Sequence, residues 1–350
     1  MASTKRTRIL MIYTGGTIGM MENPDTHALE PFPFENLLKN VPKISMLDFD
    51  VETFQFKKPL DSSSMNPTHW GEIAEIIRKN YDDYDGFVVL HGTDTMAYTA
   101  SALSFMLENL TKPVVITGSQ LPIGEVRTDG EENLITALQV AAARDRYGNH
   151  IVREVAILFE NYLWRGNRST KHSSTNFNAF TSNNYPPLAK IGLGISFNDY
   201  ALWHPTKAEE QQTLKVHLGM DTNVLYLDLF PGIREDHVRH LLNTPGVKGI
   251  IMKTFGAGNG PTEPWFLKLI REAVDRGMVI VNITQCSNGS VHPRRYVTGY
   301  ELLQAGVIPG HDLTPEAAIT KMMYLFGKNL SIEEVKEQME CPIAGEMTCL

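Results

Sequence analysis

Short β-branched runs recur along the chain, each followed by a Gly- or Ser/Thr-rich turn and then by a segment of helical period. This alternation predicts parallel βαβ units and therefore an α/β fold. The runs predicted as strands are 8–13, 86–90, 113–117, 155–159, 223–229, 248–254 and 278–284. The segments predicted as helices are 69–80, entered through Asn66-Pro67, 96–110 and 131–144. Further helix starts are predicted at Thr314-Pro315 and at Ser331, where Glu334 completes a capping box.

The alternation weakens over residues 201–221, where Trp203, His204 and Pro205 lead into a tract rich in Glu and Gln. We expect a linker at 201–221 between two domains. Residues 1–200 then form a larger, Rossmann-like N-terminal domain with a parallel sheet, and residues 222–350 form a smaller C-terminal α/β domain. A chain of 350 residues has the length of two domains.

Charge and apolar runs exclude several classes of protein. The chain has 32 Lys+Arg against 40 Asp+Glu and a formal charge of −8, so nucleic acid is not expected as a main partner. The apolar run at 9–13 is too short for a signal peptide, and the sequence has no apolar run long enough for a membrane span. Three cysteines without paired spacing predict neither a disulfide framework nor a zinc site and fit a reducing compartment, so a cytoplasmic location is expected.

The first predicted strand runs into the glycine-rich turn Thr14-Gly15-Gly16-Thr17-Ile18-Gly19. Glycines let the chain turn sharply and bring backbone N–H groups close to a ligand. In an open parallel sheet, ligands bind beyond the carboxyl ends of the strands, where this turn must lie. The alternative is an ordinary βα turn whose threonine caps the next helix. The turn is not a dinucleotide-binding fingerprint, because its third glycine is misplaced.

A second polar loop, His91-Gly92-Thr93-Asp94-Thr95, follows the strand predicted at 86–90 and lies at the same sheet edge. Asp94 can bind an ammonium group or orient a water molecule, and Thr93 can be a nucleophile or hold one. The alternative is that Asp94 or Thr95 caps the helix that begins at Met96. His91 receives no catalytic role, because a single histidine beside a strand end is more often structural.

Two further segments carry side chains that suit a polar site. Asp61-Ser62-Ser63-Ser64 precedes a helix start, and its hydroxyls and backbone donors suit a substrate carboxylate, although a simple serine-rich cap is the alternative. Lys171 ends the basic segment 165–171 and can act as a base if it is desolvated near Arg165 and Arg168. Its alternative is a solvated basic loop.

In this order, the two glycine-rich segments resemble the signatures of the bacterial-type L-asparaginase family, in its cytoplasmic type I branch. The resemblance covers nearly the whole chain and implies a two-domain, asparaginase/glutaminase-like fold. The other segments that resemble blocks of the type I branch are Asp61-Ser62-Ser63, Thr117-Gly118-Ser119-Gln120, 165–171, Phe255-Gly256-Ala257-Gly258-Asn259 and Thr284-Gln285-Cys286.

The resemblance implies hydrolysis of L-asparagine to L-aspartate and ammonia, with neither a metal nor an organic cofactor. Thr17 would be the nucleophile that attacks the side-chain amide carbon and forms a β-aspartyl ester. Thr93 would activate the hydrolytic water and Lys171 would take its proton, while Asp94 would orient the lysine and the substrate ammonium. The residues that would hold the α-carboxylate and α-amino groups are Asp61, Ser62 and Ser63.

The family also implies a homodimer or homotetramer, in which Asn259 would help to complete a site across a subunit boundary. The alternative for Asn259 is an ordinary turn residue.

Two positions depart from the family's pattern. Several members have a tyrosine on a mobile lid after the nucleophile, where this chain reads His27-Ala28-Leu29-Glu30-Pro31, and Tyr296 is the candidate for the missing phenol. The type I branch includes members with an allosteric asparagine site, built around an arginine and a Thr-Gln-Cys segment. Lys253 stands where that arginine would be, so we expect weak or no effector binding. The matching residues are Thr284, Gln285 and Cys286.

Two alternatives remain for the activity. One is a glutaminase of the same family, or the asparaginase-like subunit of a tRNA-dependent amidotransferase. That subunit typically has an extra N-terminal domain, whereas the first predicted strand here begins at Arg8. The other is an asparagine sensor without catalysis. The set of Thr17, Thr93, Asp94 and Lys171 argues against it, because a binding protein needs neither two hydroxyl groups nor a base.

Overall fold

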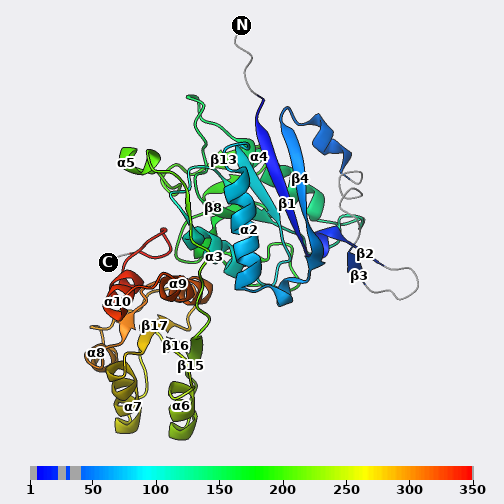
Figure 1. Ribbon diagram of the computed structural model, residues 1–350. Coiled ribbons are helices and arrows are strands. Elements are labelled where there is room, and N and C mark those ends of the chain that lie inside the picture. Colours follow the sequence, from blue (N-terminus) through cyan, green and yellow to red (C-terminus); the bar gives the residue numbers. More distant parts are fainter. Residues whose placement is uncertain (1–5, 23–28, 32–40, 349–350) are drawn as a thin grey trace. The chain divides into compact units, whose positions relative to one another are not determined.

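The computed structural model describes residues 6–22, 29–31 and 41–348. The chain divides into two compact units, Met1–Leu218 and Gly219–Leu350, and each contains its own sheet (Figure 1). Both units are α/β. None of the helices in the described part of the chain is long and apolar enough to cross a membrane.

The first unit contains an eight-stranded sheet in the order β13 (Ile195–Phe197), β12 (Ala189–Ile191), β9 (Tyr162–Arg165), β8 (Val155–Phe159), β7 (Val114–Thr117), β5 (Gly86–Leu90), β1 (Arg8–Gly15) and β4 (Asp50–Leu60). The five strands from β8 to β4 pair in parallel, which confirms the strands predicted at 8–13, 86–90, 113–117 and 155–159. The remaining three strands pair antiparallel and were not predicted. The sheet is therefore parallel where the predicted site lies and antiparallel at one end.

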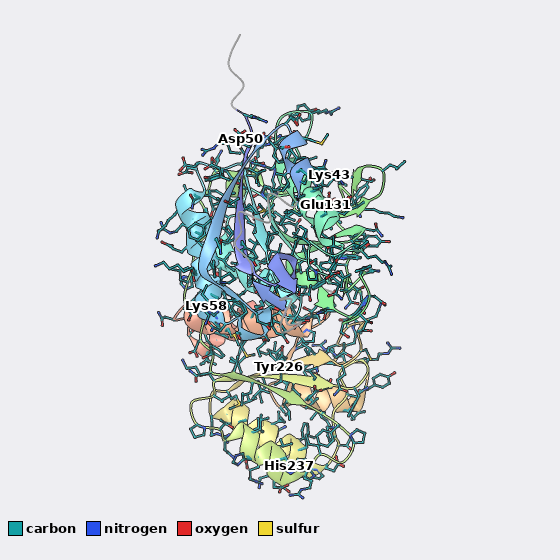
Figure 2. The ribbon with its side chains drawn as sticks, turned by 90° about the vertical axis from the view of Figure 1, so that its right-hand side faces the viewer. Lys43, Asp50, Lys58, Glu131, Tyr226 and His237 are labelled. Atoms are coloured by element: carbon teal, nitrogen blue, oxygen red, sulfur yellow. The ribbon has the colours of Figure 1, made fainter. Side chains whose placement is uncertain are left out.

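The long strand β4 forms the other edge of this sheet and was also missed by the sequence pattern. Most of its side chains are exposed, so it has no buried apolar run. Near the end of the strand, the carbonyl of Leu60 accepts from the N–H of Gly16 at 3.2 Å, so the backbone groups of Leu60 face the turn after β1. Those of Pro59, one residue earlier, face the outer side, where its missing N–H breaks no hydrogen bond of the sheet. Figure 2 labels Asp50 and Lys58 toward the two ends of this strand.

Helices cover both faces of the first sheet (Figure 1). The helix α2 (Pro67–Asn80) begins as predicted, with the Asn66 side chain accepting from the N–H of Thr68, and it packs against α3 (Met96–Met106). The helix α4 (Gly130–Ala142) covers the opposite face, where Leu134 and Leu138 share a core with Ile9 and Met11 of β1. The connections β5–α3–β7 and β7–α4–β8 both move toward the same edge of the sheet, but their helices lie on opposite faces. The two crossovers therefore have opposite handedness, and one of them departs from the right-handed crossover that is usual between parallel strands.

The prediction that the helix at Met96 continues to residue 110 is wrong. At Leu107 the chain enters the short strand β6 (Leu107–Glu108), which pairs with β14 (Lys215–Val216). Asn109 then takes a left-handed conformation with φ 61°, which ends the helical path. Residues 201–221, predicted as a linker, contain the short helix α5 (Lys207–Glu210) as well as β14.

The second unit contains a parallel sheet in the order β15 (Val224–Asp228), β16 (Gly249–Thr254), β17 (Val279–Thr284) and β18 (Ile308–Pro309), which confirms the three strands predicted there. One face packs against α6 (Glu235–Leu242), α7 (Pro264–Asp275) and α8 (Val297–Gln304). The helix α9 (Pro315–Gly327) contacts β15, β16 and β17 and is followed by α10 (Ile332–Glu340). The Thr314 cap and the Ser331–Glu334 capping box are confirmed.

A fully buried ion pair anchors the end of the chain to α9. Lys321 Nζ lies 2.6 Å from Glu346 Oε1, and both side chains have no exposed surface. The lysine also donates to the carbonyl of Cys341 at 2.6 Å, and the glutamate accepts from the N–H groups of Ile343 and Ala344. These bonds satisfy both charges inside the second unit, as buried charges require.

Candidate active site

The turn after β1 presents Thr17 at the carboxyl edge of the first sheet. Gly16 has φ 90°, a conformation that favours glycine, and its N–H donates to the carbonyl of Leu60 at 3.2 Å. Thr17–Gly19 then forms a single 3₁₀ turn, η1, whose cap residue is Gly16 and which has no side-chain cap. The alternative of a threonine that caps a helix is therefore wrong. Thr17 is half-buried at the start of the turn.

Close contacts between glycines bring the turn of Thr17, the loop of Thr93 and the serine segment together. A Cβ atom on Gly16 would lie 2.4 Å from the nitrogen of Gly92, so these two backbones touch. A Cβ atom on Gly92 would in turn lie 2.6 Å from Ser62 Oγ. Because no side chain fits at either glycine, residues next to them in sequence meet in one small region.

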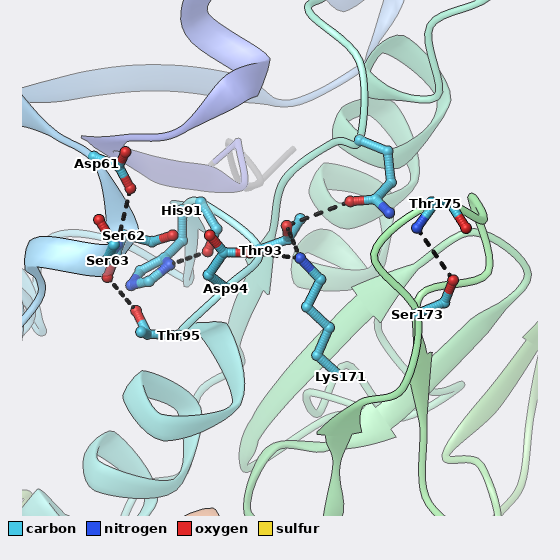
Figure 3. A network of polar contacts seen from close by, with 12 residues as sticks. Asp61, Ser62, Ser63, His91, Thr93, Asp94, Thr95, Lys171, Ser173 and Thr175 are labelled. Carbon is cyan, nitrogen blue, oxygen red and sulfur yellow. Dashed lines mark hydrogen bonds and ion pairs between the residues drawn. The ribbon is translucent and has the colours of Figure 1, made fainter.

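Lys171 bridges the two polar side chains of the second loop. It lies in the short strand β10 (Thr170–Lys171), paired with β11 (Phe180–Thr181). Its Nζ donates to Thr93 Oγ1 at 2.7 Å and pairs with Asp94 Oδ1 at 2.7 Å, as Figure 3 shows. The Asp94 side chain is 63% exposed, whereas that of Lys171 is only 17% exposed. A hydroxyl, an amine and a carboxylate are thus in contact, with the carboxylate reaching solvent.

The alternative that Asp94 or Thr95 caps the helix at Met96 holds for the position only. Thr95 is the N-cap residue of α3, but its side chain makes no capping hydrogen bond there. Thr95 instead donates from its hydroxyl to the carbonyl of Ser62 at 2.7 Å, which ties the loop to the serine segment. The Thr93 hydroxyl also donates to Gln120 Oε1 at 3.3 Å. The polar side chains of the loop are therefore directed into the site rather than to the helix.

The arginines near Lys171 in sequence anchor its loop. Arg165 is buried and pairs with Glu154 at 2.6 Å. The guanidinium groups of Arg165 and Arg168 lie 4.5 Å and 5.0 Å from the ring centre of Tyr185. Cation–π contacts of this kind hold the segment 165–168 in place. The charged partner of Lys171 is the Asp94 carboxylate.

The serine segment forms a short 3₁₀ turn, η3 (Ser62–Ser64), before α2 begins. Asp61 Oδ1 accepts from the N–H of Ser63 at 2.9 Å, so an aspartate rather than a serine caps this turn, while Asn66 caps α2. Ser62 is buried beside Gly92, and Asp61 and Ser63 are exposed. The segment thus serves as a cap and also borders the loop of Thr93.

His91 lies under this site as a fully buried imidazole. Its Nδ1 is 2.6 Å from the carbonyl oxygen of Gly92, and its Nε2 is 2.8 Å from Thr99 Oγ1. Burial lowers the pKa of His91 to about 4, so the ring is neutral at pH 7. A neutral histidine cannot serve as a permanent cation in this site.

A phenol near the nucleophile turn was missed by the sequence analysis. The Tyr13 hydroxyl donates to the carbonyl of Gly19 at 3.0 Å, and burial raises the pKa of Tyr13 to about 12. This phenol therefore supports the turn and is not a base at neutral pH. Tyr296, the candidate from sequence, is half-exposed in the second unit, before α8. His27 and Ala28 of the predicted lid lie outside the described residues, and Leu29–Pro31 pairs with Met20–Glu22 as strands β3 and β2.

The residues of the predicted effector site lie at the carboxyl edge of the second sheet. Lys253 Nζ pairs with Asp228 Oδ2 at 2.6 Å. The Gln285 amide donates to the carbonyl of Lys253 at 2.9 Å, and the Thr284 hydroxyl donates to that of Gly256 at 2.7 Å. Cys286 follows as an exposed thiol. Nearby, Asn259 Oδ1 accepts from the Thr298 hydroxyl at 2.8 Å.

Comparison with known proteins identifies the class. Residues 8–202 match the family model for the N-terminal domain of asparaginases, and residues 223–339 match that for the glutaminase/asparaginase C-terminal domain. The chain belongs to the asparaginase family, in agreement with the resemblance and with the two-domain α/β fold.

Individual relatives support the type I branch. The chain is 44% identical to L-asparaginase 1 of Escherichia coli K12 over 347 residues, which cover 98% of this chain and 99% of that protein. It is 41% identical to the 60 kDa lysophospholipase of Mus musculus, over 97% of this chain and 62% of that longer protein. The crystal structure of L-asparaginase I from Vibrio cholerae matches with a TM-score of 0.88 and 42% identity, covering 99% of this chain and 100% of that one.

Proposed function

We propose that this chain is an L-asparagine amidohydrolase in which Thr17 is the nucleophile. The observation that carries the proposal is the contact of Lys171 with both Thr93 and Asp94, at 2.7 Å each. An amide is a poor electrophile, so its hydrolysis needs a positioned nucleophile, donors for the oxyanion and anchors for the substrate. The close contact of Gly16 and Gly92 supports the convergence of these parts.

In the first half of the reaction, the Thr17 hydroxyl oxygen attacks the side-chain amide carbon of asparagine. The backbone N–H of Thr93 stabilises the oxyanion that forms. The C–N bond then breaks, the proton of the threonine hydroxyl ends on the leaving nitrogen, and ammonia leaves behind a β-aspartyl ester on Thr17.

In the second half, a water molecule attacks the ester carbon. Thr93 orients this water, and the proton of the water passes through the Thr93 hydroxyl to Lys171, which acts as an amine and lies 2.7 Å from that hydroxyl. The bond between the acyl carbon and the Thr17 oxygen breaks, Lys171 returns the proton to the threonine oxygen, and L-aspartate leaves. No metal or organic cofactor takes part in this proposal.

The substrate is a small zwitterion, and the site offers a partner for each charge. The exposed Asp94 carboxylate binds the α-ammonium group while it holds Lys171. The hydroxyls and backbone of Ser62 and Ser63, with the side chain of Asp61, hold the α-carboxylate and α-amino groups. The contacts of Ser62 with Gly92 and Thr95 support this placement, because they bring the serine segment beside the reacting groups.

We further propose that asparagine is at most a weak effector at the second sheet. Lys253 is already neutralised by Asp228, and a lysine cannot bind a carboxylate in the bidentate manner of an arginine. A rate that rises hyperbolically with asparagine is expected. Sigmoidal kinetics that disappear in Lys253→Ala or Cys286→Ala would contradict this.

The protein is proposed to act in the cytoplasm as a homodimer or homotetramer, with Asn259 completing a site across a subunit boundary. Sedimentation of the purified chain tests the assembly. A monomer with full activity would refute the role of Asn259.

The enzymatic test is ammonia release from L-asparagine, L-glutamine and D-asparagine by the wild type and Thr17→Ala. L-Asparagine should be the best substrate, Thr17→Ala should be inactive, and the exposed control Thr213→Ala should match the wild type. Asparagine and glutamine differ by one methylene, a difference that a binding pocket discriminates by about 1–3 kcal/mol. Faster turnover of glutamine would favour the glutaminase alternative, and asparagine binding without turnover would favour the sensor. Near-normal turnover in Thr17→Ala would remove the nucleophile assignment.

A further inference from the structure

We propose that His91 is a positioning residue, which fixes the Gly92–Thr93 peptide so that the Thr93 N–H faces the oxyanion of the transition state. The inference rests on the proposed function, because an oxyanion forms only if this site attacks an amide or ester. His91 itself touches no reacting atom in this account.

The hydrogen bonds of His91 define its tautomer from both sides. A carbonyl oxygen can only accept, so the Nδ1 atom, 2.6 Å from the Gly92 oxygen, must carry the proton. The neutral ring then has an unprotonated Nε2, which accepts from the Thr99 hydroxyl at 2.8 Å. Thr99 can donate there because its oxygen accepts from Trp70 Nε1, an obligate donor, at 3.0 Å. One directed chain of hydrogen bonds therefore runs from Trp70 to the Gly92 carbonyl.

Peptide geometry transmits this chain to Thr93. In a trans peptide, the C=O of one residue and the N–H of the next point in opposite directions from one rigid plane. Because His91 holds the Gly92 carbonyl, the Thr93 N–H must point away from the imidazole ring. Figure 3 shows the hydrogen bond of the His91 ring to this loop, and it shows Thr93 and Asp94, the next residues of the loop, beside Lys171.

The Thr93 N–H is available for a ligand. Among the hydrogen bonds of the described residues, none has this N–H as its donor, and Thr93 is 8% exposed. Buried backbone donors are nearly always paired, so a nearly buried donor without a protein acceptor indicates that a ligand or water completes it. The backbone of Gly16, next to Thr17, packs against Gly92 at the same point. A donor and the proposed nucleophile therefore flank one place.

The anchoring of the ring explains why a histidine suits this position. Thr99 on α3 and Trp70 on α2 are both buried, so the ring is tied to two helices of the first unit. An oxyanion donor lowers the barrier most when it needs no reorientation during the reaction. A carbonyl held by a rigid, neutral ring meets that condition.

Two substitutions separate this role from a simple packing role. In His91→Asn, the side-chain amide can place a donor where Nδ1 stands and keep the bond to Gly92. In His91→Gln, the amide reaches the position of Nε2, so it keeps the Thr99 bond and loses the donor to Gly92. We expect kcat to fall about 100-fold in His91→Gln with KM little changed, because removing an oxyanion donor costs roughly 10²–10³ in kcat. His91→Asn should retain kcat to within about tenfold.

The outcomes distinguish this inference from the proposed function. Suppose that the wild type releases ammonia and Thr17→Ala does not. If His91→Asn and His91→Gln then have the same kcat, or differ from the wild type only in KM, the inference about His91 is wrong and the proposed function stands. If the wild type releases no ammonia, or Thr17→Ala remains active, the proposed function itself fails. Should the variants not fold, ¹⁵N NMR of histidine-labelled wild type decides: a protonated Nδ1 with a bare Nε2 supports the inference, and the other tautomer overturns it.

Discussion

The buried imidazole of His91 predicts a defined loss of stability in acid. Its pKa falls from an ordinary 6.5 to about 4 in the folded chain, because burial disfavours the charged ring. Below pH 6.5 the unfolded chain therefore binds a proton that the folded chain does not, and the free energy of unfolding falls. At 1.36 kcal/mol per pKa unit, the loss from this residue reaches about 2.5 kcal/mol at pH 4.5 and levels off below pH 4.

Urea unfolding of the wild type, His91→Asn and His91→Leu, followed by circular dichroism from pH 7.5 to 4.5, measures this loss. Other titrating groups are common to all three chains, so differences between them isolate His91. Each variant should be less stable than the wild type at pH 7.5, and its deficit should shrink by about 2.5 kcal/mol at pH 4.5. If the stability deficit decreases by the same amount in both variants, the pH dependence is assigned to the missing imidazole ring. A deficit that stays constant with pH would refute the buried, neutral imidazole and the hydrogen bonds derived from it.

Three further variants test other contacts. Lys321→Met should lower the free energy of unfolding by about 3–5 kcal/mol, because it leaves a buried carboxylate unpaired. In a urea melt, the double variant Lys321→Met with Glu346→Leu should recover much of this loss. Equal losses of stability in the single and the double variant would contradict the pairing. Gly16→Ala should abolish ammonia release, since its Cβ would lie 2.4 Å from the Gly92 nitrogen, and an active variant would contradict that contact. Lys171→Met should lower kcat about 10²–10⁴-fold, and an unchanged kcat would exclude it as the base.

The two glycine-rich loops could be predicted from the sequence because each directly follows a short apolar run. Parallel strands end at the same edge of a sheet, so the sequence alone predicts that Thr17 and Thr93 lie close together. The partner of Thr93 could not be placed in this way, since Lys171 is 78 residues away along the chain. The residues predicted only a possible base at Lys171, the family resemblance implied that it acts with Thr93, and the structure shows the contact.

The residues that the sequence analysis missed, or left without a role, act through groups that carry no sequence signal. Tyr13 and His91 bond to the carbonyl oxygens of Gly19 and Gly92, and every residue has such a carbonyl. No spacing of side chains reveals these bonds. The strand β4 was missed for a related reason, because an exposed edge strand needs no buried apolar pattern.

The end of the helix at Met106 shows how a distant segment overrides local propensity. Residues 107–110 continue the apolar pattern, but Leu107 and Glu108 pair with Lys215 and Val216, more than a hundred residues later. Tertiary pairing of this kind is invisible to a window along the chain.

A crystal structure of Thr17→Ala with L-asparagine bound tests the central claim most directly. The claim predicts that the side-chain amide faces the position of the missing hydroxyl, with its oxygen within hydrogen-bonding distance of the Thr93 N–H. It also predicts the α-ammonium at Asp94 and the α-carboxylate at Ser62 and Ser63. Asparagine bound at another place in the chain, or with its amide out of reach of both threonines, would contradict the account.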